Sequence, residues 1–244
     1  MTNVLVLQSD PLSPLALVGE ELGKIGFELK VRRCAEGDAV TKQDLTADGL
    51  IVLGGPQSVI DPKHVTLMQT MMNAVKVFHA TDRPILGICL GAQVIAKALG
   101  GDVRRHEELQ FGFKQLAYSK GACDDSILKQ VTSPVRVFCW HEDHVTLPEN
   151  ARLLASTSTV ENCIFRLGER TYGFQCHFEA MPVSLKAMLD RGRHLVPKNL
   201  GDKGYQLLDE IEQEIKTYLE TAMNFGARVT ENWAGLFLKA PAVK

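Results

Sequence analysis

Residues 84–101 read PILGICLGAQVIAKALGG, and they place a cysteine between two glycines where an apolar run passes into a helical pattern. The first five residues predict a buried strand, and those from about Leu90 to Leu99 predict a helix. Gly87 and Gly91 are small enough to allow a tight turn between the two elements. Such a turn raises a nucleophile above the edge of a sheet, as the G-x-S-x-G elbow does for serine.

Cys89 would lie at the N-terminus of that helix, where the positive end of the helix dipole favours a thiolate. The stretch is therefore a candidate site for thiol chemistry. Glycine-rich joints between strand and helix are also common in α/β proteins. A buried cysteine that only fills space is thus an equally good interpretation of this stretch taken alone.

The chain before this stretch alternates short apolar runs with helical patterns. Strands are predicted at 4–9, 27–31 and 49–55, and helices are predicted after Ser13 and Asp61, which are candidate N-caps. Near-continuous apolar strands that alternate with helices indicate a mostly parallel central sheet with helices on both faces. The expected fold class is therefore α/β.

The chain after this stretch is richer in strands. Short strands, some of them expected as antiparallel additions to the sheet, are predicted at 113–119, 135–140, 151–157, 163–168 and 172–176. C-terminal helices are predicted from about Pro182 to Arg191 and from residue 204 onward, followed by a second apolar set at 229–237. We expect one domain over residues 1–190 and a helical extension over 191–244 packed on it; a partner or dimer surface is the alternative use of the extension.

The charge balance of the chain indicates which classes of partner are not expected to bind it. With 27 Lys and Arg against 29 Asp and Glu, the formal net charge is -2, which argues against nucleic acid and anionic lipid as partners. The apolar stretch at 84–101 is interrupted by Gln93 and Lys97, which argues against a membrane span. The N-terminus looks like a first strand and not a signal peptide.

The six cysteines form no C-x-x-C pair, which is neither a zinc pattern nor a dense disulfide framework. A reducing cytoplasm therefore suits the chain best. Apart from Cys89, we expect these cysteines to be small buried hydrophobic residues.

A thiol nucleophile needs a base, and the base needs an orienting group. In YGFQCHFEA (172–180), His177 and Glu179 lie on the same side of an extended segment, so Glu179 can hold the imidazole while its other nitrogen faces Cys89. A partly exposed histidine beside a carboxylate is the commoner explanation for such a pair alone. Together with the elbow, the pair predicts a nucleophile and its base.

The glycines of LGGPQS (53–58) follow a predicted parallel strand and should lie at the carboxyl edge of the sheet. The backbone N–H groups of Gly55 and of Leu90 are candidate donors to a developing oxyanion. A plain turn is the alternative for a Gly-Gly-Pro sequence.

Three motifs, GGPQS, GICLGAQ and GFQCHFE, resemble the class I glutamine amidotransferase domains, particularly stand-alone members similar to the amidotransferase half of GMP synthase. The resemblance runs from about residue 3 to 190 and implies a flavodoxin-like fold. It also implies a triad of Cys89, His177 and Glu179, with oxyanion donors at Gly55 and Leu90.

The resemblance also assigns substrate contacts. Gln93 matches the position that contacts glutamine, and WHEDHV (140–145) is similar to a segment that lies over the substrate, which makes His141 and Asp143 candidate contacts. Glu142 replaces the glycine that is usual there. His141 with His144 does not predict a metal site, because the spacing suits one only on a helix and no third ligand is obvious.

The implied reaction is hydrolysis of the γ-amide of glutamine through a γ-glutamyl thioester, without metal or organic cofactor. The chain would then release ammonia for a separate synthase subunit. An independent hydrolase of γ-glutamyl peptides or amides is the first alternative, and a non-catalytic or thiol-sensing protein on the same fold is the second. The sequence leaves open whether the chain forms a homo-oligomer.

Overall fold

The structure is a computed structural model that describes residues 1–131 and 133–238. In the first half, strands alternate with helices in the order β1 (Asn3–Gln8), α1 (Ala16–Lys24), β2 (Glu28–Arg33), β3 (Gly49–Val52), α2 (Val65–Ala80), β4 (Ile85–Ile88) and α3 (Leu90–Ala98). In the second half, strands precede helices in the order β5 (Asp102–Gln115), β6 (Ala117–Tyr118), β7 (Arg136–Thr146), β8 (Arg152–Ser156), β9 (Ile164–Leu167), β10 (Thr171–Phe174), α4 (Pro182–Leu200) and α5 (Asp202–Ala234).

The central sheet has the strand order β2-β1-β3-β4-β10-β9-β8-β6. β2, β1, β3, β4 and β10 run parallel, whereas β9, β8 and β6 are added antiparallel beyond β10. The expected mostly parallel sheet with antiparallel additions is therefore confirmed. The carboxyl ends of the parallel strands meet at one edge, where sites of such folds are found.

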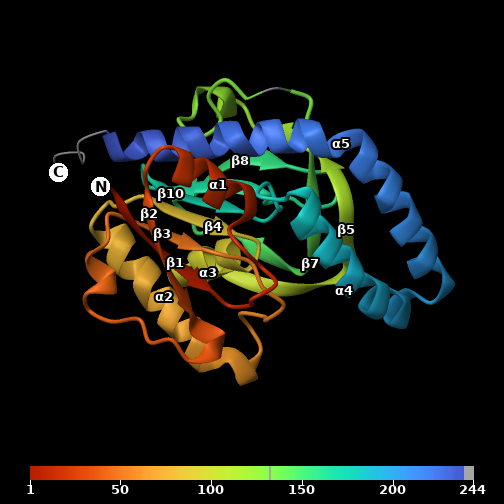
Figure 1. Ribbon diagram of the computed structural model, residues 1–244, viewed down its shortest axis with the longest axis horizontal. Coiled ribbons are helices and arrows are strands. Elements are labelled where there is room, and N and C mark those ends of the chain that lie inside the picture. Colours follow the sequence, from red (N-terminus) through yellow and green to blue (C-terminus); the bar gives the residue numbers. More distant parts are fainter. Residues whose placement is uncertain (132, 239–244) are drawn as a thin grey trace.

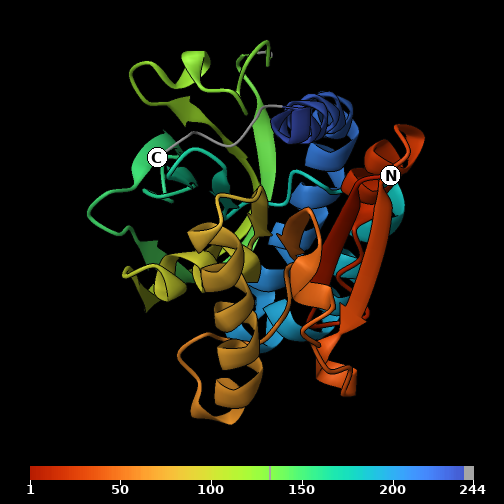
Figure 2. The same cartoon turned by 90° about the vertical axis from the view of Figure 1, so that its left-hand side faces the viewer.

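Helices cover both faces of this sheet (Figure 1). Along β1 the side chains alternate: Val4 and Val6 enter the core under α1 and α5, while Leu5 and Leu7 enter the core under α2 and α3. A strand buried on both faces needs apolar residues at every position, which is why β1 shows no polar alternation. Figure 2 shows α5 end-on, well separated from α2.

β5 and β7 pair antiparallel in a sheet of their own. A third core joins this sheet to α4 and α5 through residues such as Phe111, Phe138, Leu185 and Ile211. α5 also packs against α1 on the central domain. The predicted boundary at residue 190 falls inside α4, and the division of the chain into two parts stays a prediction.

Several predicted boundaries were wrong. Ser13 is no helix cap: its N–H donates to the carbonyl of Asp10 in a turn (2.9 Å), and α1 begins at Ala16 without a side-chain cap. Asp61 does cap, but it caps the short 3-10 turn Pro62–His64 that precedes α2. The strand predicted from residue 113 begins at Asp102 as β5, because pairing with β7 holds the charged segment before it extended. The helix predicted to end at Arg191 continues as α4 to Leu200, in spite of an internal proline.

The C-terminal apolar sets, predicted as two, belong to the single helix α5 and the turn Gly235–Leu238 after it. The prediction of five buried cysteines was also wrong, because Cys123 is exposed and Cys34 only half-buried. Among the helices that the structure describes, none is both long and apolar enough to cross a membrane.

Candidate active site

Cys89 sits alone between β4 and α3, in a strained backbone conformation (φ 50°, ψ -105°). Its N–H donates to the carbonyl of Phe174 at 2.7 Å, which ties the turn to the neighbouring strand β10. A Cβ on Gly91 would lie 1.9 Å from the carbonyl oxygen of Val52, so only glycine lets α3 approach β3 this closely. Positive φ at a non-glycine residue costs about 1–3 kcal/mol and is concentrated at functional sites. The sharp turn predicted from the two glycines is present.

His177 and Glu179 follow β10 and form a buried pair, with 2.7 Å between His177 Nδ1 and Glu179 Oε1. The N–H of His177 donates to the carbonyl of Phe138 in β7 (2.7 Å), which fixes the histidine between the two sheets. Burial opposes protonation of the imidazole, but the Glu179 carboxylate and Cys89 together raise the pKa of His177 well above its ordinary value.

The side chains of Cys89 and His177 line the same cavity, and Cys89 is among the groups that raise the pKa of His177. A Cβ on Gly54 would lie 3.3 Å from His177 Cε1 and 3.6 Å from the Cβ of Cys89, so Gly54 lies against both residues. Because Nδ1 bonds to Glu179, Nε2 is the ring nitrogen that remains available to the thiol. The structure thus brings together the thiol, the imidazole and the carboxylate that the sequence singled out.

The two predicted oxyanion donors lie close to the thiol. Gly55 lines the same cavity as Cys89, and a Cβ there would meet Ser9 Oγ. Leu90 is the first residue of α3, so its N–H is among those that a helix leaves without an intrahelical acceptor. The role of both N–H groups as donors to an oxyanion stays a prediction.

The predicted substrate contacts are buried in the same cavity and bond to the protein. The Gln93 side chain donates to the carbonyl of Asp143 (3.3 Å) and to Gln175 Oε1 (3.4 Å). His141 Nδ1 lies 3.0 Å from the carbonyl of Asp143. The Asp143 carboxylate accepts from Ser58 Oγ at 2.5 Å. These contacts brace the WHED segment of β7, and contact with substrate stays a prediction.

Two polar residues of the site were missed by the sequence reasoning. Gln175 is fully buried, and its Nε2 donates to Cys89 Sγ at 3.8 Å. A polar residue two positions before His177 in an apolar strand was a usable signal. Arg105 of β5 bonds to Asp143 Oδ1 (3.1 Å) and Glu142 Oε2 (2.8 Å); only the pairing of β5 with β7 reveals this contact.

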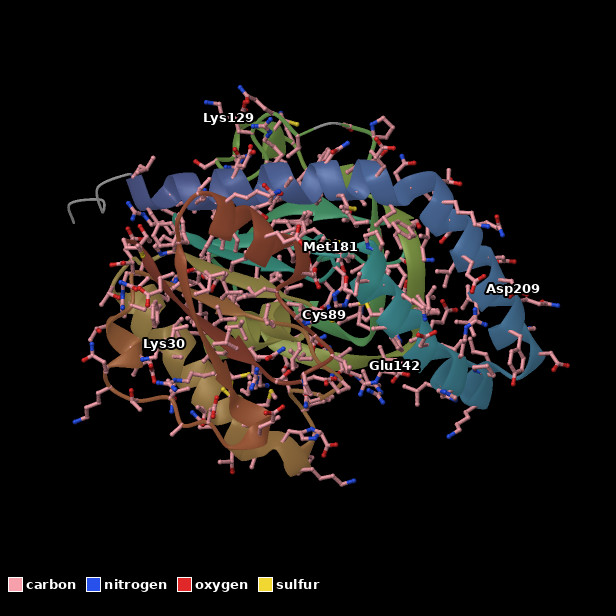
Figure 3. All side chains as sticks on the ribbon, in the orientation of Figure 1. Lys30, Cys89, Lys129, Glu142, Met181 and Asp209 are labelled. Carbon is pink, nitrogen blue, oxygen red and sulfur yellow. The ribbon has the colours of Figure 1, made fainter. Side chains whose placement is uncertain are left out.

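The cavity has a volume of about 250 Å³ and extends outward from Cys89. Its outer walls come from the loop between β1 and α1, from β5 and β7, and from α4. Figure 3 labels Cys89 in the interior, Glu142 on β7, and Met181 just before α4. Within residues 1–131 and 133–238, no cluster of three histidine, cysteine or acidic side chains could hold a metal ion.

Comparison with known proteins identifies the family. The profile of the glutamine amidotransferase class-I family matches residues 14–192. The glutamine amidotransferase-like protein YfeJ of Salmonella typhimurium is 26% identical over 171 residues, which cover 69% of this chain and 72% of that protein. The glutamine-hydrolyzing GMP synthase of Porphyromonas gingivalis is 34% identical over 133 residues, 54% of this chain and 24% of the synthase.

This chain therefore matches only about a quarter of that synthase. A crystal structure of a glutamine amido transferase from Methylobacillus flagellatus shares the fold, with a TM-score of 0.81 at 21% identity, over 96% of this chain and 95% of that one. The family profile covers most of the chain, including the Cys89 elbow and the His177–Glu179 pair, and the protein belongs to the class I glutamine amidotransferase family.

Proposed function

We propose that this protein hydrolyses the γ-carboxamide of glutamine through a γ-glutamyl thioester on Cys89. The observation that carries the proposal is a thiol on a strained turn with a hydrogen-bonded His177–Glu179 pair beside it in one cavity. A nucleophile, a base and an orienting group in hydrogen-bond contact are the recurring parts of covalent amide hydrolysis.

In the first half of the reaction, Cys89 Sγ attacks the γ-carbonyl carbon while the thiol proton resides on His177 Nε2. The oxyanion that develops accepts hydrogen bonds from the N–H groups of Gly55 and Leu90. The carbon–nitrogen bond then breaks, and His177 passes its proton to the departing nitrogen, which leaves as ammonia. The raised pKa of His177 supports this role, because the imidazole keeps the proton until the leaving group takes it.

In the second half, water attacks the thioester carbonyl and His177 accepts a proton from it. The carbon–sulfur bond breaks, glutamate leaves, and the proton returns to Cys89. Glu179 orients the ring and stabilises the imidazolium in both halves. Every step uses side chains and backbone groups of this chain.

The destination of the ammonia is the second part of the proposal. The match to one segment of a glutamine-hydrolyzing GMP synthase supports delivery to a separate acceptor enzyme. A cytoplasmic location is proposed with it, supported by six cysteines that are all unpaired.

An independent γ-glutamyl hydrolase is a second candidate, because the cavity does not end at the thiol. α4 adds a wall that contains Met188 and Leu195, and Leu12 of the loop after β1 lines the same cavity. A leaving group as small as ammonia has no use for this added space, whereas a larger amine would fill it.

The test is release of glutamate by the purified chain from glutamine and from a panel of γ-glutamyl amides. We expect turnover to vanish in Cys89→Ser, and to be unchanged in the control Cys123→Ser, whose cysteine is exposed. Slow glutamine hydrolysis that a synthase accelerates would support delivery of ammonia. Robust turnover of larger amides by the chain alone would support the independent hydrolase.

Glutamate release by Cys89→Ser at the wild-type rate would rule out the thioester. A wild-type chain that releases no glutamate from any of these compounds, and whose Cys89 resists a glutamine-like electrophile, would point to a non-catalytic protein.

A further inference from the structure

The active-site cavity has two chemically different ends. Its inner end is polar and holds Cys89, Gln93 and His177. Its outer end is lined by large apolar side chains on four different segments, namely Leu12, Leu109, Trp140, Met188 and Leu195. Trp140 lines the cavity, and its backbone carbonyl accepts from Cys89 Sγ at 3.7 Å. One of the apolar residues of the cavity therefore neighbours the nucleophile in space.

Two of these apolar residues are open to solvent, Leu12 with 52% and Leu195 with 44% of their surface exposed. Single exposed leucines are ordinary on a protein surface. These two, however, come from segments far apart in sequence and lie on the wall of the same cavity. An apolar wall beside a reactive group favours a ligand with an apolar part.

One buried carboxylate fixes the two leucines relative to each other. Asp10 Oδ1 accepts from the N–H of Leu12 (3.0 Å), and Asp10 Oδ2 accepts from Arg191 Nη1 of α4 (2.5 Å). Leu195 lies four residues beyond Arg191 and hence about one turn along the same face. The outer end is thus held in shape before any ligand binds.

Charged groups at the outer end are engaged with one another. Arg105 bonds to Glu142 and Asp143, and Arg191 bonds to Asp10. A charged substituent would therefore meet groups whose charge is already balanced within the protein. An uncharged, apolar substituent gains from Leu12 and Leu195 and leaves the pairs intact.

We propose that the substrate is a γ-glutamyl amide whose amine half is apolar, an alkyl or aromatic group. The glutamyl half lies at the inner end, and the amine half lies against Leu12, Trp140, Met188 and Leu195. This inference rests on the proposed hydrolysis at Cys89, and it names the substrate of the second candidate function, the independent γ-glutamyl hydrolase. The reaction consumes one water: the γ-carbonyl exchanges its bond to nitrogen for a bond to Cys89 and then to oxygen, and the products are glutamate and the free amine.

The first test measures kcat/KM of the full chain for glutamine and for γ-glutamyl methylamide, butylamide and benzylamide. Burial of apolar surface predicts a rise of about fourfold for each methylene that enters the outer end. We therefore expect butylamide and benzylamide to exceed glutamine by at least tenfold. Equal or falling values along the series would overturn the inference and leave hydrolysis at Cys89 standing.

The second test replaces the exposed leucines singly, in Leu12→Asn and Leu195→Asn. We expect kcat/KM for benzylamide to fall about tenfold in each, while the value for glutamine stays within twofold. The matched control is Leu200→Asn, since Leu200 is on the same helix with 40% of its surface exposed and does not line the cavity. It should leave both substrates unchanged.

Equal losses for glutamine and benzylamide in Leu195→Asn and Leu12→Asn would also overturn the inference, because the leucines would then act on structure alone. A further comparison pairs γ-glutamyl phenethylamide with γ-glutamylphenylalanine, which adds a carboxylate to the same aromatic amine. We expect faster turnover of the phenethylamide, and faster turnover of γ-glutamylphenylalanine would overturn the assignment of an uncharged amine. If Cys89→Ser retains full activity on every compound, it is the proposed function that fails.

Discussion

The inner and outer ends of the active-site cavity are built in different ways. At the inner end, Cys89, His177 and Glu179 are each about 5–6% exposed and sit where strands of the central sheet end. At the outer end, Leu195 and Arg105 are exposed and come from α4 and β5, outside that sheet.

This difference predicts how each end responds to mutation. Burial at the inner end leaves electrostatic interactions unscreened, so the loss of one group has large effects on the others. At the outer end, water and salt weaken each charge, and each leucine contributes only the apolar area that it covers. Large catalytic effects should therefore come from the inner end, and selectivity between substrates from the outer end.

The largest effect in this comparison is expected for His177→Ala, which removes the base. We predict a fall in kcat for glutamate release of at least about 10²-fold, the usual size of general acid–base catalysis. The control is His64→Ala, a partly exposed histidine that does not line the cavity. A loss of less than tenfold in His177→Ala, with the fold intact by circular dichroism, would show that another group takes the proton.

A smaller effect is expected for Glu179→Gln, which keeps the shape of the side chain and removes its charge. The carboxylate raises the pKa of His177, so its loss lets burial lower that pKa. We predict a fall of about tenfold in kcat/KM and a shift of the alkaline limb of its pH profile to lower pH. An unchanged pH profile would show that Glu179 acts through orientation alone.

The same variant has a consequence for stability. The pKa of His177 is raised in the folded state, so protonation of His177 stabilises the fold. This stabilisation is fully present below the ordinary histidine pKa of about 6.5, and it disappears as the pH rises through the raised pKa. We therefore expect urea unfolding of Glu179→Gln to differ most from wild type at low pH. A difference that grows with rising pH would contradict this assignment.

The sequence predicted the inner end far better than the outer one, and the reason is physical. Strands buried on both faces, such as β1 and β4, leave continuous apolar runs, and the turn at Cys89 needs glycines that can be read directly. The pairing of His177 with Glu179, two residues apart, was also predicted correctly, although the segment after β10 bends and turns and is not extended as the prediction assumed.

The outer end depends on contacts between distant segments, which no local pattern reveals. α4 was predicted to stop at Arg191, yet it continues to Leu200 because packing of residues such as Val196 outweighs the low helix propensity of Gly192 and Pro197. Leu195, which the shorter helix excluded, became visible only in the structure. Arg105 was likewise hidden in a charged segment that becomes a strand through pairing with β7.

The smallest effect is expected for Arg105→Gln at the rim. The side chain of Arg105 is 62% exposed, so its ion pairs with Glu142 and Asp143 are screened by solvent. Asp143 also keeps its hydrogen bond from Ser58 (2.5 Å). We predict that kcat/KM for glutamine changes by less than about fivefold, and that the change shrinks further at high salt.

The matched control for this rim prediction is Arg104→Gln, the same change one residue earlier on β5 at a side chain that is 75% exposed and pairs with Asp102. Both variants should resemble wild type if the rim charges only pair with each other. A hundredfold loss in Arg105→Gln alone would mean that the guanidinium makes charge-assisted hydrogen bonds to the α-carboxylate of the substrate. The contrast between a catalytic inner end and a selective outer end would then fail at this residue.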